Sequence, residues 1–120
     1  MPGGGAKHHR ERLGASIREE VSAIIEGELG DPRIGLVSVS EVRLAPDGHS
    51  ARIYVLVDGG GEEAERCLQG LNAARGYIRR ELTRRLQVRQ APELFFVVDR
   101  SEQYGTRIDE LLDRIHKRNR

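Results

Sequence analysis

The stretch from residue 71 to residue 82 constrains the fold most, because it combines a helical apolar pattern with a charge that the pattern would bury. On one continuous helix, at about 100° per residue, Arg75 falls on the apolar face. An unpaired buried guanidinium is very costly, so one straight helix is disfavoured. We therefore predict two helices joined at a tight kink of Ala74, Arg75 and Gly76, with the glycine relieving the backbone. The apolar positions of this stripe are Leu71, Ala74, Ile78, Leu82 and Leu86.

Basic residues cluster in and after this stretch, although the net charge of the chain is only +1. Six arginines lie between residues 75 and 89, against the single acid Glu81. Guanidinium groups contact phosphates and stack on exposed bases, so such a cluster is typical of nucleic-acid binding. Arg10 and Arg12 either extend this surface or belong to a disordered basic start. The candidate RNA-binding residues are Arg75, Arg79, Arg80, Arg84, Arg85, Arg89, Arg10 and Arg12.

The length of 120 residues suits a single domain with its own core. We expect a flexible segment at 1–9, one domain at 10–116 and a short basic tail at 117–120. No apolar run predicts a transmembrane helix, and the single cysteine, Cys67, fits a reducing, cytoplasmic setting. The four histidines show no metal-ligand spacing and no nucleophile motif is present, so we expect no enzyme activity, no metal and no cofactor.

The hydrophobic periodicity predicts an α+β fold, with helices packed on one face of a three-stranded mixed sheet. Gly30 stands where a left-handed helix cap belongs. The apolar residues of the first strand change parity, which predicts a bulge near Ser40 and Glu41. The predicted elements are a helix (7–29), a strand (34–44), a strand (51–57), a helix (62–74), a helix (77–86), a strand (94–98) and a last helix that begins near 103–106.

Two of these elements carry further expectations. The strand at 94–98 is apolar on both faces, which favours a central place in the sheet. On the helix at 77–86, Tyr77, Arg80 and Arg84 are expected to project away from the core, with Arg79 on the flank.

The order of elements resembles the type II KH fold, and four stretches resemble the ribosome-binding factor A family more narrowly. The resemblance covers about residues 10–112, with the stretches in the expected order and spacing. No single motif decides it, whereas the ordered set is highly specific. The stretches are DPRIGLVSV (31–39), APDGHSARIYV (45–55), LNAARGYIRREL (71–82) and PELFFVVDRS, running on to Tyr104 and Gly105.

The resemblance implies a non-catalytic factor that binds the immature 30S ribosomal subunit. It implies contacts with 16S rRNA near the 5′ end and the decoding-region junction, late in assembly, and a role in growth in the cold. The resemblance also implies that the factor leaves the 30S subunit when assembly GTPases act. We expect the protein to be a monomer. Ordinary KH domains clamp nucleotides with a Gly-x-x-Gly loop. In this family an Ala-x-Gly kink replaces that loop, here at 74–76.

Other interpretations of the basic residues stay open. The arginines of the third helix also fit an ordinary solvated face, and Arg84 and Arg85 fit the complement of a helix C-terminus. Asp31 and Arg33 fit a role in fixing a turn. The alternative function is a small basic α+β module for protein interaction or translational regulation, whose basic face would meet acidic protein partners.

Overall fold

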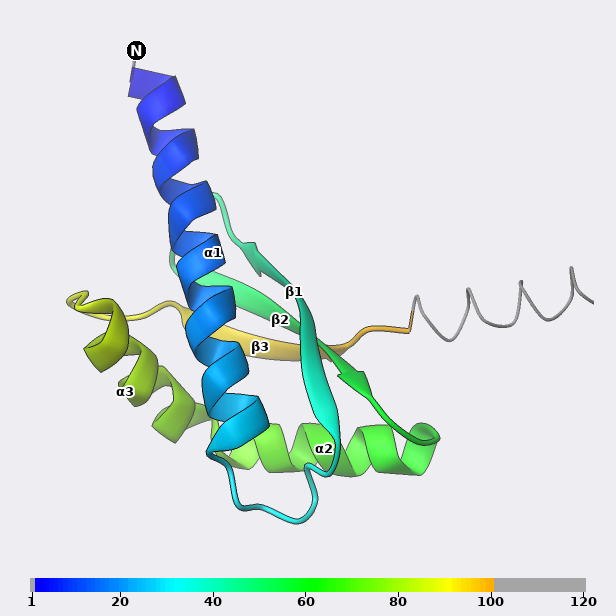
Figure 1. The fold of residues 1–120 in the computed structure, drawn as a ribbon. Coiled ribbons are helices and arrows are strands. Elements are labelled where there is room, and N and C mark those ends of the chain that lie inside the picture. The colour runs from blue at the N-terminus through cyan, green and yellow to red at the C-terminus, as the bar shows by residue number, and fades with distance from the viewer. Residues whose placement is uncertain (1, 101–120) are drawn as a thin grey trace, which may run out of the picture.

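The computed structural model describes residues 2–100, with side chains from His9 onward. Its element order, α-β-β-α-α-β, is that of the type II KH fold and confirms the predicted α+β class (Figure 1). The last helix, expected to begin near 103–106, lies outside the described residues. The elements are α1 (Pro2–Gly27), β1 (Val37–Leu44), β2 (Ser50–Val57), α2 (Gly61–Ala73), α3 (Arg75–Leu86) and β3 (Glu93–Val98).

The first helix, α1, begins earlier than the sequence pattern indicates. It starts at Pro2 instead of Lys7, so the backbone of the glycine-rich start is helical in this structure. Proline suits the first turn of a helix, because its missing N–H has no partner there and its φ is already helical. The division into a segment 1–9, a domain 10–116 and a tail 117–120 stays a prediction.

The end of α1 also differs from expectation. The helix ends at Gly27, and the N–H of Glu28 makes a last helical bond to the carbonyl of Ile24 at 3.0 Å. Gly30 does not take the predicted left-handed conformation, whereas Gly35 has a φ of 60°. The cap was predicted wrongly because the chain leaves the helix before Gly30. The left-handed conformation occurs at Gly35 instead.

The hairpin of β1 and β2 confirms the sequence prediction. The two strands pair antiparallel, and their register shifts between Val39 and Glu41, where the bulge was expected. The shift returns Val42 to the side that Val39 occupies, so both contribute to the core. The connecting turn contains Gly48 at a φ of 76°, a conformation that favours glycine.

The third strand, β3, lies at the edge of the sheet, not at its centre. The strand order is β1-β2-β3, and β3 pairs parallel with β2. Leu94 is fully buried, whereas Phe95 and Val97 are 42% and 36% exposed. The central position was predicted wrongly because apolar residues on both faces suggested two covered faces, and here the outer residues remain accessible.

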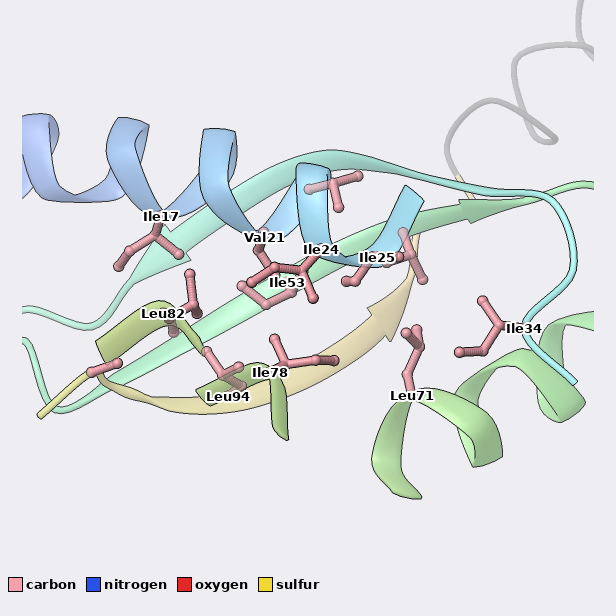
Figure 2. Close-up of a cluster of buried hydrophobic side chains, with 14 of the residues drawn as sticks. Ile17, Val21, Ile24, Ile25, Ile34, Ile53, Leu71, Ile78, Leu82 and Leu94 are labelled. Carbon is pink, nitrogen blue, oxygen red and sulfur yellow. The ribbon is translucent and has the colours of Figure 1, made fainter. Parts of the chain in front are cut away.

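The core lies between the helices and one face of the sheet (Figure 2). Figure 2 shows side chains of α1 pointing toward the sheet, with residues of α2 and α3 closing the layer. Burial of each such aliphatic side chain is worth about 1.5–3 kcal/mol. None of the helices within residues 2–100 is long and apolar enough to cross a membrane. The largest fully buried side chains are Ile17, Ile24, Ile53, Leu71, Ile78, Leu82, Leu94, Val21, Val55 and Cys67.

Candidate nucleic-acid interface

Helix α3, which carries most of the basic cluster, meets α2 at a single residue, Ala74. Helix α2 ends at Ala73 and α3 begins at Arg75, while Ala74 has a φ of −90° and a ψ of 1°. The N–H of Ala74 donates to the carbonyl of Gly70 at 3.0 Å, and the N–H of Ile78 donates to the carbonyl of Ala74 at 2.9 Å. The chain therefore changes direction while the helical hydrogen bonds on both sides are kept.

Gly76 is not the residue that makes this bend. It is exposed in the first turn of α3, and its φ is not positive. A Cβ atom added there would lie 3.3 Å from Nη1 of Arg80, which is the far end of a flexible side chain. We predicted that glycine flexibility makes the bend, whereas Ala74 makes it in the bridge region of φ and ψ, which is sparsely populated but does not require glycine.

The bend gives Arg75 a place outside the apolar core. Its Nη2 donates to Oδ1 of Asn72 at 2.5 Å, and its guanidinium carbon lies 6.0 Å from the ring centroid of Phe95. Its Nε is buried and has no hydrogen-bond partner among the described residues. Arg75 therefore links the helix junction to β3, and part of its hydrogen-bonding capacity is unused.

Three side chains, Tyr77, Arg80 and Arg84, form what we call the α3 outer face. They are spaced by three and then four residues, so they lie on one side of the helix. Tyr77 is 40% exposed, and the side chain of Arg84 is 71% exposed. Arg80 is exposed and has no ion-pair or hydrogen-bond partner within residues 9–100. All three project away from the core, as predicted.

The acid on α3, Glu81, accepts hydrogen bonds from two arginines. Nη2 of Arg84 donates to Oε2 of Glu81 at 2.7 Å, and Nε of Arg85 donates to the same oxygen at 3.4 Å. The hydrogen bond from Arg84 is the main reason why the pKa of Glu81 is lowered. An exposed pair of this kind stabilises little, so Arg84 remains available to a stronger anion.

Arg85 has a structural environment that the sequence did not indicate. Its Nη2 donates to both carboxylate oxygens of Glu28, at 2.5 and 2.6 Å, and its Nη1 lies 3.6 Å from Oε2 of Glu20. The pKa of Arg85 is raised, chiefly by the bond to Glu28. Its side chain is only 20% exposed. Arg85 thus ties α3 to α1, and its charge is already compensated.

Arg79 is also engaged in a structural contact. Its Nε donates to the carbonyl of Ala91 at 3.0 Å, which fastens the connection between α3 and β3. Thr83 completes the same bridge, because its hydroxyl donates to the carbonyl of Arg79 and accepts from the N–H of Ala91. Arg79 therefore holds a backbone carbonyl on the flank of α3 and contributes to the fold.

The remaining candidate arginines lie apart from the α3 outer face. Nη1 of Arg10 donates to the carbonyl of Pro46 at 3.0 Å, so it connects α1 to the hairpin turn. Arg12 is exposed on α1, and Arg89 is exposed in the connection after α3. Within residues 9–100, neither Arg12 nor Arg89 has an ion-pair or hydrogen-bond partner.

A second group of arginines and aromatic residues was not singled out from the sequence. It lies on the sheet face that points away from the core, which we call the open sheet face. Period-two alternation in β2 could have found it, because Arg52 and Tyr54 alternate with the buried residues of that strand. The aromatic and basic members of the open sheet face are Arg43, Arg52, Tyr54 and Phe95, with Val97 beside them.

The turn after α1 is organised by Asp31 and Arg33. The carboxylate of Asp31 accepts bonds from the backbone N–H, Nε and Nη2 of Arg33, the last at 2.6 Å. These bonds lower the pKa of Asp31 to about 2. The interpretation of this pair as turn-fixing residues is confirmed.

Cys67 behaves as a core residue. It is fully buried on α2, and burial raises the pKa of its thiol. Among the described residues, no three His, Cys, Asp or Glu side chains are grouped to hold a metal ion.

A sequence model of the family described as "Ribosome-binding factor A" matches residues 9–112, which is most of the chain. The chain belongs to the ribosome-binding factor A family. A member from Koribacter versatilis (strain Ellin345), named ribosome-binding factor A, is 60% identical over 114 residues, covering 95% of this chain and 93% of that protein.

Two structures of ribosome-binding factor A from Thermus thermophilus share the fold. The crystal structure of ribosome-binding factor A from Thermus thermophilus superposes with a TM-score of 0.65 at 30% identity, over 74% of this chain and 94% of the Thermus chain. The second is a homology model of Thermus thermophilus ribosome binding factor A fitted into the cryo-EM map of a 30S–RbfA complex. It has a TM-score of 0.63 and 32% identity, over 74% of this chain and 93% of that chain.

Proposed function

We propose that this chain is a non-catalytic assembly factor that binds the immature 30S subunit through its 16S rRNA. Family membership supports a ribosomal partner, because a Thermus relative has been fitted into a map of a 30S–RbfA complex. The observation that carries the RNA contact is the α3 outer face, where Arg80 is exposed and unpaired within residues 9–100. Arg84 is mostly exposed, and within residues 9–100 its one partner is Glu81, in a weak surface pair.

The candidate arginines do not contribute equally in this proposal. Arg80 and Arg84 contact phosphates, and Tyr77 stacks beside them. Arg75, at the helix junction, adds positive charge next to this face, whereas Arg12 and Arg89 are exposed charges that lie apart from it. The other candidates stabilise the fold through the contacts described above and do not bind RNA in this proposal: Arg79, Arg85 and Arg10.

The finer biological role follows from the family resemblance. The proposal includes contacts near the 5′ region of 16S rRNA and the decoding-region junction, late in maturation, and a contribution to growth in the cold. It also includes release when assembly GTPases act. The protein works as a monomer without a cofactor, in the cytoplasm where ribosomal subunits are assembled.

A double charge reversal tests the α3 outer face. Arg80→Glu with Arg84→Glu should weaken binding to immature 30S particles by at least tenfold at low salt, since two phosphate contacts are replaced by repulsion. Each lost phosphate contact should also reduce the slope of log affinity against log salt by about 0.7–0.9. Binding is measured across a salt series, and circular dichroism checks that the fold is kept.

The matched control is Arg18→Glu with Arg66→Glu, which makes the same charge change at exposed positions of α1 and α2. This control should bind within about twofold of the unchanged protein. An Arg80→Glu, Arg84→Glu variant that binds 30S as tightly as the control would show that the α3 outer face is not the contact.

A further inference from the structure

The open sheet face presents two adjacent cross-strand rows of side chains. Residues directly opposite each other in a sheet are close enough to interact, so each row acts as a unit. Each row contains one aromatic ring, and both guanidinium groups lie in the row of Phe95. The first row is Arg43, Arg52 and Phe95, and the second is Glu41, Tyr54 and Val97.

The first row places two like charges opposite each other. Arg43 and Arg52 are direct cross-strand partners, an arrangement that costs free energy unless it is compensated. Arg43 is compensated, because its Nε donates to Oε1 of Glu41 at 2.8 Å and its guanidinium carbon lies 5.2 Å from the ring centroid of Tyr54. Arg52 is exposed and has no partner within residues 9–100. An anion bound beside Arg52 would relieve this repulsion.

Phe95 lies between two arginines that come from different parts of the chain. Arg52 is its cross-strand neighbour on β2, and the guanidinium carbon of Arg75, at the α2–α3 junction, lies 6.0 Å from its ring centroid. The ring is 42% exposed. Accessible aromatic rings beside arginines are typical of single-stranded nucleic-acid binding sites, because bases stack on the rings and phosphates pair with the guanidinium groups.

We propose that a single-stranded RNA segment lies across the open sheet face. One base stacks on Phe95, a second stacks near Tyr54, and the phosphates between them meet Arg52 and Arg75. The proposal rests on RNA as the ligand class of the proposed function, but it uses a face other than the α3 outer face. Arg75 lies between the two surfaces, so one RNA strand can pass from one to the other.

The distribution of charge favours RNA over an acidic or apolar protein segment as the occupant. Glu41 is already bound by Arg43, and Glu93 lies on the same face one row away from Phe95, opposite Ser50. Beside the ring itself are two arginines, Arg52 and Arg75, so positive charge predominates there. A stacking ring within reach of two cations fits a chain in which bases and phosphates alternate.

A fluorescent reporter tests the proposal directly. The chain contains no tryptophan, so Phe95→Trp gives the full-length protein one indole at the proposed stacking site. A ten-nucleotide single-stranded RNA of mixed sequence should quench this indole by at least half, in a saturable and salt-dependent manner. In the free protein, iodide should quench the same indole readily, because Phe95 is accessible.

Two variants in the reporter background separate charge from packing. Arg52→Glu should weaken RNA affinity about tenfold and lower the salt slope by about 0.7, the value for one phosphate contact on a single strand. Arg18→Glu, the matched change on α1, should leave the affinity within twofold. Thermal unfolding of each variant checks that the sheet is intact.

The outcomes distinguish this proposal from the proposed function. Labelled RNA that binds the reporter protein without quenching the indole overturns the open-face proposal and leaves the α3 outer face standing. An indole already shielded from iodide in the free protein also overturns it, because another part of the chain then covers the face. Quenching that survives Arg80→Glu with Arg84→Glu but is lost with Arg52→Glu supports the open sheet face on its own.

Discussion

Arg84 and Arg85 are neighbours in the sequence but have different surroundings. Among the side chains of residues 9–100, that of Arg84 is 71% exposed and pairs with Glu81 alone, whereas that of Arg85 is 20% exposed and reaches Glu20, Glu28 and Glu81. One residue along a helix is a rotation of about 100°, which is enough to turn a side chain from solvent to a neighbouring helix. A run of arginines therefore cannot be treated as one binding surface.

Arg85→Ala should destabilise the protein, because the carboxylates of Glu20, Glu28 and Glu81 would lose the cation between them. We expect the melting temperature to fall by several degrees. Arg84→Ala should leave it nearly unchanged, because an isolated exposed pair contributes little. Thermal unfolding at neutral pH and low salt measures both. Equal melting temperatures for the two variants would contradict a structural role for Arg85.

The carboxylate of Asp31 should contribute a pH-dependent part of the stability. The pKa of Asp31 falls to about 2 in the folded protein, below its ordinary value, so the contribution is present above that ordinary value. It is lost as the pH falls toward about 2. Asp31→Asn should therefore be less stable than the unchanged protein at pH 6, and the difference should shrink in acid.

Urea unfolding between pH 2.5 and pH 6 measures this difference. Glu19→Gln, at an exposed position on α1, is the control for loss of one negative charge. A stability difference for Asp31→Asn that is the same at both ends of the range would show that the carboxylate charge is not the cause.

At the scale of the elements, glycine has different meanings at different places in the helices. Gly70 is buried in α2, and a Cβ atom added there would lie 2.7 Å from Cγ1 of Ile34. Gly14 lies in α1, and apart from the adjacent turns of the helix no atom of the described residues comes within 4 Å of such an atom. The first glycine permits a close approach between α2 and the loop after α1, whereas the second only weakens its helix.

Opposite effects are expected for the two Gly→Ala changes. Gly14→Ala should stabilise by about 0.5–1 kcal/mol, the usual gain in a helix interior. Gly70→Ala should destabilise, because overpacking against the buried Ile34 costs about 1–3 kcal/mol and exceeds that gain. Urea unfolding measures both changes. A stabilised Gly70→Ala variant would show that the loop at Ile34 moves away at little cost.

At the scale of the whole molecule, the helices and strands were predicted better from the sequence than the way in which they pack and pair with one another. The apolar stripes, the bulge at Glu41 and the break before Arg75 follow from local rules of periodicity and sterics. The edge position of β3 could not be predicted, because it depends on which strands pair, and β3 pairs with β2 across the whole α2–α3 segment. The alternation of residues in β1 and β2 does indicate which side chains point to the open sheet face. An outward arginine in a strand nevertheless looks like an ordinary surface residue until its cross-strand neighbours are known.

The sequence predicted that basic residues cluster in the candidate site, but it did not predict how their side chains are arranged. Exposure of Arg80 and Arg84 follows from helical spacing, which the sequence contains. Arg79, Arg85 and Arg10 bind Ala91, Glu28 and Pro46, which lie 12, 57 and 36 residues away in the chain, so no local pattern reveals these contacts. Contacts between distant segments decide which arginines are free to meet RNA.

The parallel pairing of β3 with β2 has a consequence for the order in which the protein forms. The β1–β2 hairpin joins neighbouring segments and costs little chain entropy, whereas β3 reaches β2 only after the whole α2–α3 segment has been made. During synthesis, β2 therefore keeps an unpaired edge until residue 98 has emerged. The late arrival of β3 makes this edge the part of the nascent chain most open to mispairing with another strand.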